Sequence, residues 1–196
     1  MKLAVFDLDG TMYRCNTLFA FIRAQKECRV LSRFADCTFV KVLDRYCPGC
    51  RRALMLFSLR YFSNAGLELR AREFVCNYLP SQQRSSAFAL LERLRSAQYT
   101  IMLSSSAPHF LVRSCAHAID ADYWCASIYK DGRLSFDLSG QKEQYLPAHE
   151  ILFVCTDNLN DLPLLHIATE KCVYATCRTV HAWKALVPIS VICEED

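Results

Sequence analysis

Five short apolar runs, each about the length of a β-strand, place the tightest constraint on the fold of this 196-residue chain. They are KLAVFDL at 2–8, YTIMLSS at 99–105, EILFVCT at 150–156, KCVYAT at 171–176 and PISVIC at 188–193. Stretches with helical periodicity separate most of them. Continuous apolar runs of this kind are typical of strands buried on both faces of a parallel sheet. The sequence therefore predicts an α/β fold with a parallel sheet flanked by helices.

The segment between the first two runs has a different pattern. From Asn16 to Tyr78 the apolar residues recur at mixed three- and four-residue steps, as in Leu18, Phe21 and Ile22. This spacing is typical of amphipathic helices. We therefore predict an α/β core made of residues 1–13 and 86–196, with an all-helical insertion at 14–85.

The composition indicates a soluble globular protein. Hydrophobic residues make up 53% of the chain and charged residues 22%, and no apolar stretch reaches the length of a membrane-spanning helix. The N-terminus, MKLAVFDLD, meets an acidic residue too early for a signal peptide. Twelve cysteines in apolar contexts without a repeated spacing favour buried, reduced thiols and a cytoplasmic location. The C-x-x-C pair Cys47 and Cys50 is open to a redox or zinc-binding interpretation, but no second ligand pair accompanies it.

The motif DLDGT places two carboxylates at the end of the first predicted strand. Ligands of open α/β sheets bind outside the carboxyl ends of the strands, and Asp7 lies at such an end. Asp7 and Asp9 are two positions apart on an extended chain, so their side chains point the same way. Their repulsion is relieved by a shared proton or by a cation, of which Mg²⁺ suits carboxylates best. Gly10 allows a sharp turn, and the Thr11 hydroxyl can cap the next segment of the chain.

An apolar strand followed by DxDGT resembles the first motif of the haloacid dehalogenase-like phosphatases. The resemblance implies a Rossmann-like core in which Asp7 attacks phosphorus and forms an aspartyl-phosphate. It also implies that Asp9 protonates the leaving oxygen and then activates water.

The second and third motifs of this family are a hydroxyl and a lysine. SSSAP at 104–108 resembles the second motif, with Ser105 as the hydroxyl that contacts phosphate, Ser104 as an alternative and Ser106 as a helix cap or a further contact. Lys142 in SGQKEQYL matches the third motif, with Lys130 as the alternative. In the family, the positive charge at the Lys142 position would stabilise Asp7 and the transferred phosphoryl group.

The fourth motif is present as EILFVCTDNLNDLPLL. Asp157 and Asp161 match the acidic pair of the family, although Thr156 replaces its usual glycine. The resemblance implies one Mg²⁺ held by Asp7, Asp157 and the Asp9 main-chain carbonyl, with Asp161 acting through water or orienting the others. The further candidates for phosphate binding are Thr11, Ser106 and Asn158.

The substrate depends on the insertion, which the resemblance identifies as a cap of the phosphoserine-phosphatase-like branch. Residues 14–85 hold 13 Lys and Arg against 5 Asp and Glu. Stretches such as RRALMLFSLRYF are compatible with anionic lipid, with nucleic acid or with an ordinary solvated helix. We predict a small anionic phosphorylated metabolite or a lipid phosphate as substrate, peripheral membrane contact through the cap, and no nucleic acid. The alternatives are a phosphotransferase and a non-catalytic phosphate-binding protein.

Overall fold

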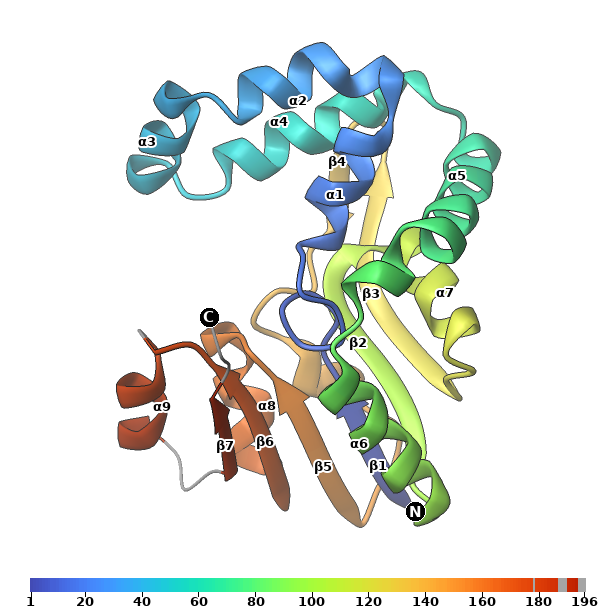
Figure 1. The fold of residues 1–196 in the computed structure, drawn as a ribbon, viewed down its shortest axis with the longest axis vertical. Helices are drawn as coiled ribbons and strands as arrows, with labels where there is room; N and C mark the ends of the chain where they lie inside the picture. The colour runs from blue at the N-terminus through green and yellow to red at the C-terminus, as the bar shows by residue number, and fades with distance from the viewer. Residues whose placement is uncertain (178, 187–189, 194–196) are drawn as a thin grey trace.

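The computed structural model describes residues 1–177, 179–186 and 190–193, which form a seven-stranded sheet with helices on both faces (Figure 1). The strand order is β4-β3-β2-β1-β5-β6-β7, and all neighbouring pairs are parallel except β3 and β4. The strands are β1 (Lys2–Phe6), β2 (Thr100–Pro108), β3 (Tyr123–Lys130), β4 (Arg133–Phe136), β5 (Ile151–Thr156), β6 (Glu170–Ala175) and β7 (Ser190–Cys193). The predicted α/β fold is confirmed.

The helices divide into two sets along the chain. Those before β2 are α1 (Thr17–Ala24), α2 (Arg29–Ala35), α3 (Thr38–Tyr46), α4 (Cys50–Ser58), α5 (Asn64–Asn77) and α6 (Ser85–Ser96). Those after β2 are α7 (His109–Ala118), α8 (Leu162–Ile167) and α9 (Val180–Leu186). Short 3₁₀ turns lie at Lys26–Cys28, Leu59–Tyr61, Leu79–Gln82, Lys142–Tyr145 and Leu159–Asp161.

The central strand β1 is buried on both faces, as its apolar sequence requires. It lies between β2 and β5, and successive side chains enter different apolar clusters. Leu3 and Val5 pack with Trp183 and the α8 leucines on one face, whereas Ala4 and Phe6 join the larger cluster on the other. This alternation is the period-two geometry of a strand, and it produces a three-layer core.

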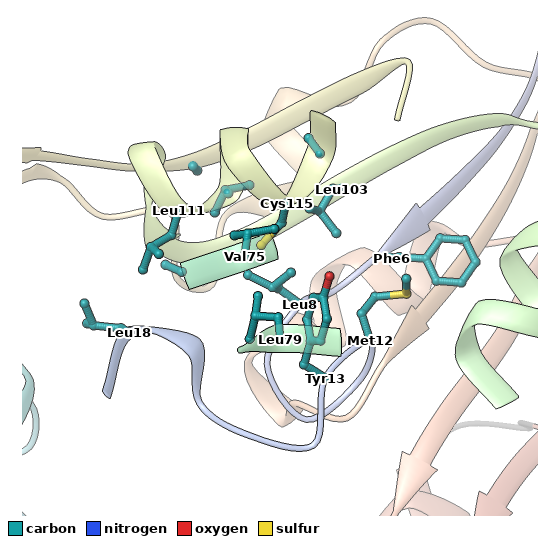
Figure 2. Close-up of a cluster of buried hydrophobic side chains, with 14 of the residues drawn as sticks. Phe6, Leu8, Met12, Tyr13, Leu18, Val75, Leu79, Leu103, Leu111 and Cys115 are labelled. Atoms are coloured by element: carbon teal, nitrogen blue, oxygen red, sulfur yellow. The ribbon is translucent and has the colours of Figure 1, made fainter. Parts of the chain in front are cut away.

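The loop after β1 is anchored in the larger cluster. Leu8 and Met12 are fully buried and Tyr13 is nearly so. Figure 2 shows these side chains among Leu79, Cys115 and other apolar groups. The apolar positions of DLDGTMY therefore hold the loop in place, while its carboxylates lie at the carboxyl end of the sheet.

The segment 14–85 is helical, and in Figure 1 α2, α3 and α4 lie beyond the carboxyl ends of the strands. Phe21 of α1 connects this segment to the rest of the chain. Its ring packs against Phe74 of α5, with centroids 5.5 Å apart, and against Phe110 of α7, at 5.6 Å. The predicted domain boundaries, 1–13 with 86–196 and 14–85, stay a prediction.

Several predicted strand boundaries differ from the observed ones. Strand β2 continues to Pro108, three residues beyond the apolar run, because an irregularity after Ser105 lets Pro108 pair again with β3. Strands β3 and β4 lie outside the five predicted runs, and the first residues of β3, YWCAS, mix apolar residues with exposed positions. Residues 188 and 189 of the last predicted run lie outside the described residues.

Two further observations concern the composition-based predictions. All the described cysteines are free, but only Cys28, Cys115, Cys155 and Cys172 are buried, so the expectation of buried thiols holds for part of them. Among the described residues, no helix is long and apolar enough to span a bilayer.

We expect Phe21→Ala to lower the free energy of unfolding by about 3–5 kcal/mol, because it removes a fully buried ring between two other rings. Phe39→Ala is the matched control, since that ring is 70% exposed, and it should change stability by no more than about 0.5 kcal/mol. Urea unfolding of the two variants measures the difference. Equal losses would contradict the role of Phe21.

Candidate active site

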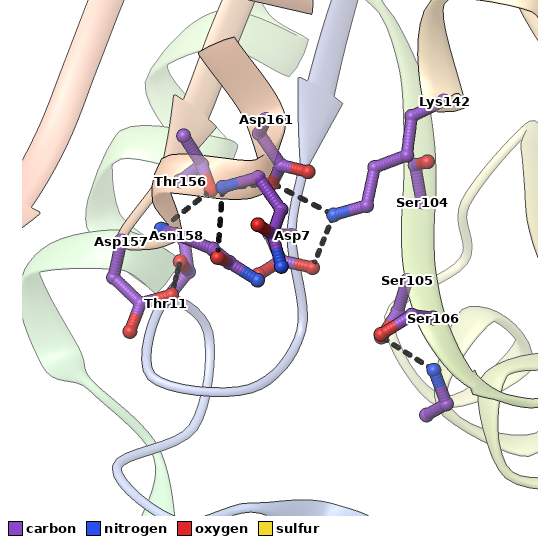
Figure 3. Close-up of polar contacts among 12 residues, drawn as sticks. Asp7, Thr11, Ser104, Ser105, Ser106, Lys142, Thr156, Asp157, Asn158 and Asp161 are labelled. Atoms are coloured by element: carbon purple, nitrogen blue, oxygen red, sulfur yellow. Dashed lines mark hydrogen bonds and ion pairs between the residues drawn. The ribbon is translucent and has the colours of Figure 1, made fainter. Parts of the chain in front are cut away.

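The site is built around Asp7, the residue immediately after β1. Its main-chain amide donates to the Cys155 carbonyl on β5 at 2.9 Å, and the residue is 6% exposed. Lys142 Nζ donates to Asp7 Oδ1 at 2.7 Å and to Asp161 Oδ2 at 2.8 Å (Figure 3). Thr156 Oγ1 also donates to Asp161 Oδ2, at 2.6 Å. One buried cation thus joins two buried carboxylates from different strand ends.

The β3–β4 hairpin delivers Lys142 to this position. The turn of the hairpin has Asp131 at φ 48° and Gly132 at φ 84°, the left-handed backbone that the Asp-Gly pair predicts. The chain then returns to the carboxyl end of β1, where Lys142 opens a 3₁₀ turn and is 3% exposed. Lys130, the alternative, is exposed at the end of β3. Of the two candidates, the structure places Lys142 against Asp7.

Asp9 is oriented by the helical segment. Its Oδ1 accepts a hydrogen bond from the Thr17 main-chain amide, at the first residue of α1, at 2.8 Å. Burial raises the Asp9 pKa above its ordinary value, and the hydrogen bond from the Thr17 amide opposes this shift only in part. The raised pKa favours a protonated Asp9, as a general acid requires.

The loop after Asp9 fits closely against Asp157. Gly10 has a φ of 71°, and a Cβ atom there would lie 1.9 Å from Asp157 Oδ2. Thr11 Oγ1 donates to Asp157 Oδ1 at 3.3 Å. Only glycine combines that backbone conformation with that approach. The motif glycine is therefore required so that the carboxylate of the β5 loop can reach the β1 loop.

Burial and mutual repulsion leave these carboxylates poorly compensated. Burial raises the Asp7 pKa to about 7, with Asp161 and Asp157 adding to the effect of burial and Lys142 opposing it. Burial likewise raises the Asp157 pKa to about 6. For Lys142, burial disfavours the charged form, but Asp7 and Asp161 outweigh it and hold the pKa above its usual value. One ammonium does not balance three neighbouring carboxylates.

A cavity of about 520 Å³ opens over Asp7 at the carboxyl ends of the strands. The predicted site residues that line it are Asp7, Asp9, Ser105, Ser106, Asp157 and Asn158. Arg14, Cys15 and Asn16 line it from the segment 14–85, and Leu159 and Thr179 complete its wall with Gly10. Thr11, Lys142 and Asp161 lie outside this lining because their polar groups are engaged beneath it.

The three serines of β2 have different environments. Ser105 lines the cavity, and its Oγ accepts from the Ala107 amide at 3.2 Å. Ser104 Oγ lies 3.0 Å from Cys125 Sγ and does not line the cavity. Ser106 lines the cavity, and its carbonyl accepts from Arg52 of α4 at 2.5 Å. Ser105 is therefore better placed than Ser104 for a phosphate contact.

Carboxylates are the candidate metal donors of this site. Within the part of the chain that the structure describes, no three His, Cys, Asp or Glu side chains are grouped so as to hold a metal. Asp7 and Asp157, however, line one cavity and share only the single ammonium of Lys142 with Asp161. Mg²⁺ is commonly bound by one or two carboxylates with waters and substrate phosphate. These two residues fit Mg²⁺. Asp161, held by Lys142 and Thr156, has the contacts of an orienting group.

Two arginines make contacts at the site that the sequence analysis did not predict. Arg84 is 4% exposed and donates to the Gly10 carbonyl at 2.7 Å and to the Thr11 carbonyl at 3.0 Å. Its guanidinium also lies 4.5 Å from the centre of the Tyr174 ring. Arg52 bridges α4 to Ser106 and Asp137. Arg84 belongs to no motif, and Arg52 was named only as part of the basic stretch RRALMLFSLRYF, so neither set of contacts had a signal in the sequence.

Comparison with known proteins gives a consistent result. The family model of haloacid dehalogenase-like hydrolases matches residues 4–166. No curated protein matches the chain. A protein of unknown function from Bordetella pertussis Tohama I is 20% identical with a TM-score of 0.73, and 97% of each chain is covered.

Two further solved structures share the fold. A phosphoserine phosphohydrolase-like protein from Francisella tularensis is 16% identical with a TM-score of 0.61, covering 98% of this chain and 95% of that one. A phospho-aspartyl intermediate analogue of phosphoserine phosphatase is 16% identical with a TM-score of 0.56, covering 100% and 93%. At these identities the likeness concerns the fold.

The raised pKa of Asp157 gives the stability of the metal-free protein a pH dependence of definite sign. Between its ordinary value of 3.8 and about 6, the unfolded chain releases this proton before the folded chain does. The free energy of unfolding therefore falls as the pH rises through this window. We expect Asp157→Asn to remove about 1–2 kcal/mol of the fall, allowing for partial exposure of the side chain. Urea unfolding in EDTA across the window measures it, with exposed Asp120→Asn as the control that should behave like wild type.

Proposed function

Since the chain belongs to the haloacid dehalogenase-like hydrolases, we propose that it is a magnesium-dependent phosphomonoester hydrolase that acts through an aspartyl-phosphate on Asp7. The observation that carries the proposal is the buried Asp7–Lys142–Asp161 arrangement beneath a cavity that Asp9, Asp157 and Ser105 also face. The relative named as a phospho-aspartyl intermediate analogue of phosphoserine phosphatase supports this chemistry by analogy of fold.

In the first half-reaction, an Asp7 carboxylate oxygen attacks the phosphorus of the substrate. The bond from phosphorus to the leaving oxygen breaks, and Asp9 gives its proton to that oxygen. Lys142 occupies Oδ1 of Asp7, so Oδ2 is the natural nucleophile. The ammonium also fixes the carboxylate, and the Ser105 hydroxyl is placed to donate to a phosphoryl oxygen.

In the second half-reaction, the ionised Asp9 takes a proton from water, and the water oxygen attacks phosphorus. The bond between phosphorus and Asp7 breaks, which releases inorganic phosphate and regenerates the carboxylate. Mg²⁺, when bound by Asp7 and Asp157, would neutralise charge on the transferred phosphoryl group. Thr17 keeps Asp9 in position through both steps.

The segment 14–85 is proposed as the cap that completes the site. Arg14, Cys15 and Asn16 contribute to the wall of the cavity. The arginines of the stretch RRALMLFSLRYF, by contrast, contact other side chains of the protein. Arg51 pairs with Asp36, and Arg52 pairs with Asp137. Arg60 stacks on the neighbouring rings of Phe57 and Tyr61. Arg14 is therefore a better candidate for substrate recognition than this stretch.

We expect Asp7→Asn to reduce hydrolysis of p-nitrophenyl phosphate at least about 10³-fold, because the amide is nearly isosteric but cannot act as the nucleophile. Activity of the wild type should disappear in EDTA and return with Mg²⁺. Exposed Asp131→Asn is the matched control and should keep full activity. A purified Asp7→Asn variant with a few per cent of wild-type activity would contradict the covalent mechanism.

The same assay separates the alternatives. A phosphate-binding protein would bind inorganic phosphate without turnover. A phosphotransferase would pass the phosphoryl group to added glycerol in preference to water, so the ratio of glycerol phosphate to inorganic phosphate identifies it. For a hydrolase, inorganic phosphate is the main product.

Arg14 is the one basic side chain among the described residues that line the cavity, and it predicts a substrate with a second anionic group. We expect Arg14→Gln to raise KM about tenfold for 3-phosphoglycerate, which carries a carboxylate, through loss of a charge-assisted hydrogen bond. The KM for p-nitrophenyl phosphate should be unchanged. Arg72→Gln, an exposed arginine on α5, is the control. Equal effects on both substrates would refute this specificity.

A further inference from the structure

Helix α3 turns an apolar stripe toward solvent. Phe39, Val42, Leu43 and Tyr46 have the i, i+3, i+4, i+7 spacing that places side chains on one helix face. All four are exposed, Phe39 by 70% and Tyr46 by 84%, whereas Val40 is the buried residue of this helix. Amphipathic helices normally bury such a stripe, so α3 presents a face suited to an external partner.

The preceding helix α2 also exposes apolar side chains. Val30 and Phe34, four residues apart on α2, are 80% and 54% exposed. In Figure 1, α2 and α3 lie at the outer end of the molecule, away from the sheet. We name these six exposed apolar residues, together with the exposed basic residues of the same two helices, the α2–α3 surface. Its basic members are Arg29, Arg33, Lys41 and Arg45.

The charge of the α2–α3 surface is uncompensated. Within the part of the chain that the structure describes, none of its four basic side chains forms an ion pair. The acidic residues of this stretch are engaged elsewhere. Asp36 accepts from Arg23 and Arg51, and Asp44 accepts from the main-chain amides of Gly49 and Arg51. The surface thus combines exposed aromatic and aliphatic groups with net positive charge.

We infer that the α2–α3 surface docks on an anionic phospholipid bilayer. Apolar side chains on one helix face enter the boundary between headgroups and acyl chains, while Lys and Arg attract anionic headgroups. A second protein copy would present the same positive charge and repel this one, so charge complementarity favours the bilayer. The inference does not depend on the proposed hydrolase activity, because lipid binding is measured without turnover.

The test is co-sedimentation of the full chain with vesicles. One set contains phosphatidylcholine alone, and the other contains equal parts of phosphatidylcholine and phosphatidylserine. Both lipids are phosphodiesters, so neither is a substrate for the proposed phosphomonoester hydrolase. We expect binding to the anionic set only, weakened by added salt.

Two double variants identify the surface. Lys41→Gln with Arg45→Gln should weaken partition into anionic vesicles roughly 30-fold, since each basic residue near the surface contributes about a factor of five. Phe39→Ser with Tyr46→Ser should weaken it at least about tenfold. Leu69→Ser with Arg72→Gln is the matched control on α5, where Leu69 is 60% exposed, and it should bind as wild type does. Because all these positions are exposed, the variants should unfold at the wild-type urea concentration.

Three results would overturn the inference. The first is no binding to anionic vesicles, and the second is binding that both α3 variants leave unchanged. The third is a dimer in analytical ultracentrifugation that Phe39→Ser with Tyr46→Ser dissociates, since the stripe would then be an interface between copies. Loss of phosphatase activity in Asp7→Asn with retained vesicle binding would leave the docking inference intact, so the two proposals fail separately.

Discussion

The ammonium of Lys142 between Asp7 and Asp161 is the interaction on which the site depends. Each of the three side chains is buried, and each arrives from a different part of the sequence. A buried charge without a partner is strongly unfavourable, and removing one member of a buried pair typically costs about 3–5 kcal/mol. The strand ends that carry Asp7 and Asp161 are therefore tied to the short turn that carries Lys142. Because Lys142 is hydrogen-bonded to Oδ1 of Asp7, the second oxygen, Oδ2, is left without this partner.

The carboxylates of Asp7 and Asp157 are held in an unfavourable arrangement. Asp157 lies so close to Gly10 that no side chain fits between them, and burial raises the pKa of both Asp7 and Asp157. A cation or a bound phosphate with its metal would relieve this repulsion. The buried carboxylates at the carboxyl ends of the strands lower the stability of the protein. The apolar layers on either face of β1 nevertheless hold the loops that carry them in place.

The sequence predicted those parts of the site that local chemistry specifies. The DLDGT loop can be predicted from an apolar strand, two carboxylates and a glycine, and Asp157 from the same logic on β5. Lys142 was reached through the family resemblance rather than through its own context. Ser105 was predicted as the phosphate contact with Ser104 as the alternative, and their environments separate the two: Ser105 lines the cavity, whereas Ser104 Oγ lies against Cys125 Sγ. Arg84 was missed, since its contacts join positions more than 70 residues apart.

The helical segment shows a different limit. Periodicity identifies that α3 is amphipathic, but it cannot tell whether the apolar face meets the core or solvent. That outcome depends on tertiary packing: α1 and α5 bury their stripes against each other and α7 through Phe21, Phe74 and Phe110, which leaves α3 at the outer end of the segment. The basic charge of residues 14–85 is likewise divided by structure. Arg51 and Arg52 pair with carboxylates of the protein, and the exposed Arg60 lies over the Phe57 ring. Arg14 lines the cavity, and the basic side chains of α2 and α3 are exposed. The basic residues of this segment thus have three different environments. Only the exposed ones on α2 and α3 are placed to contact a large anionic surface.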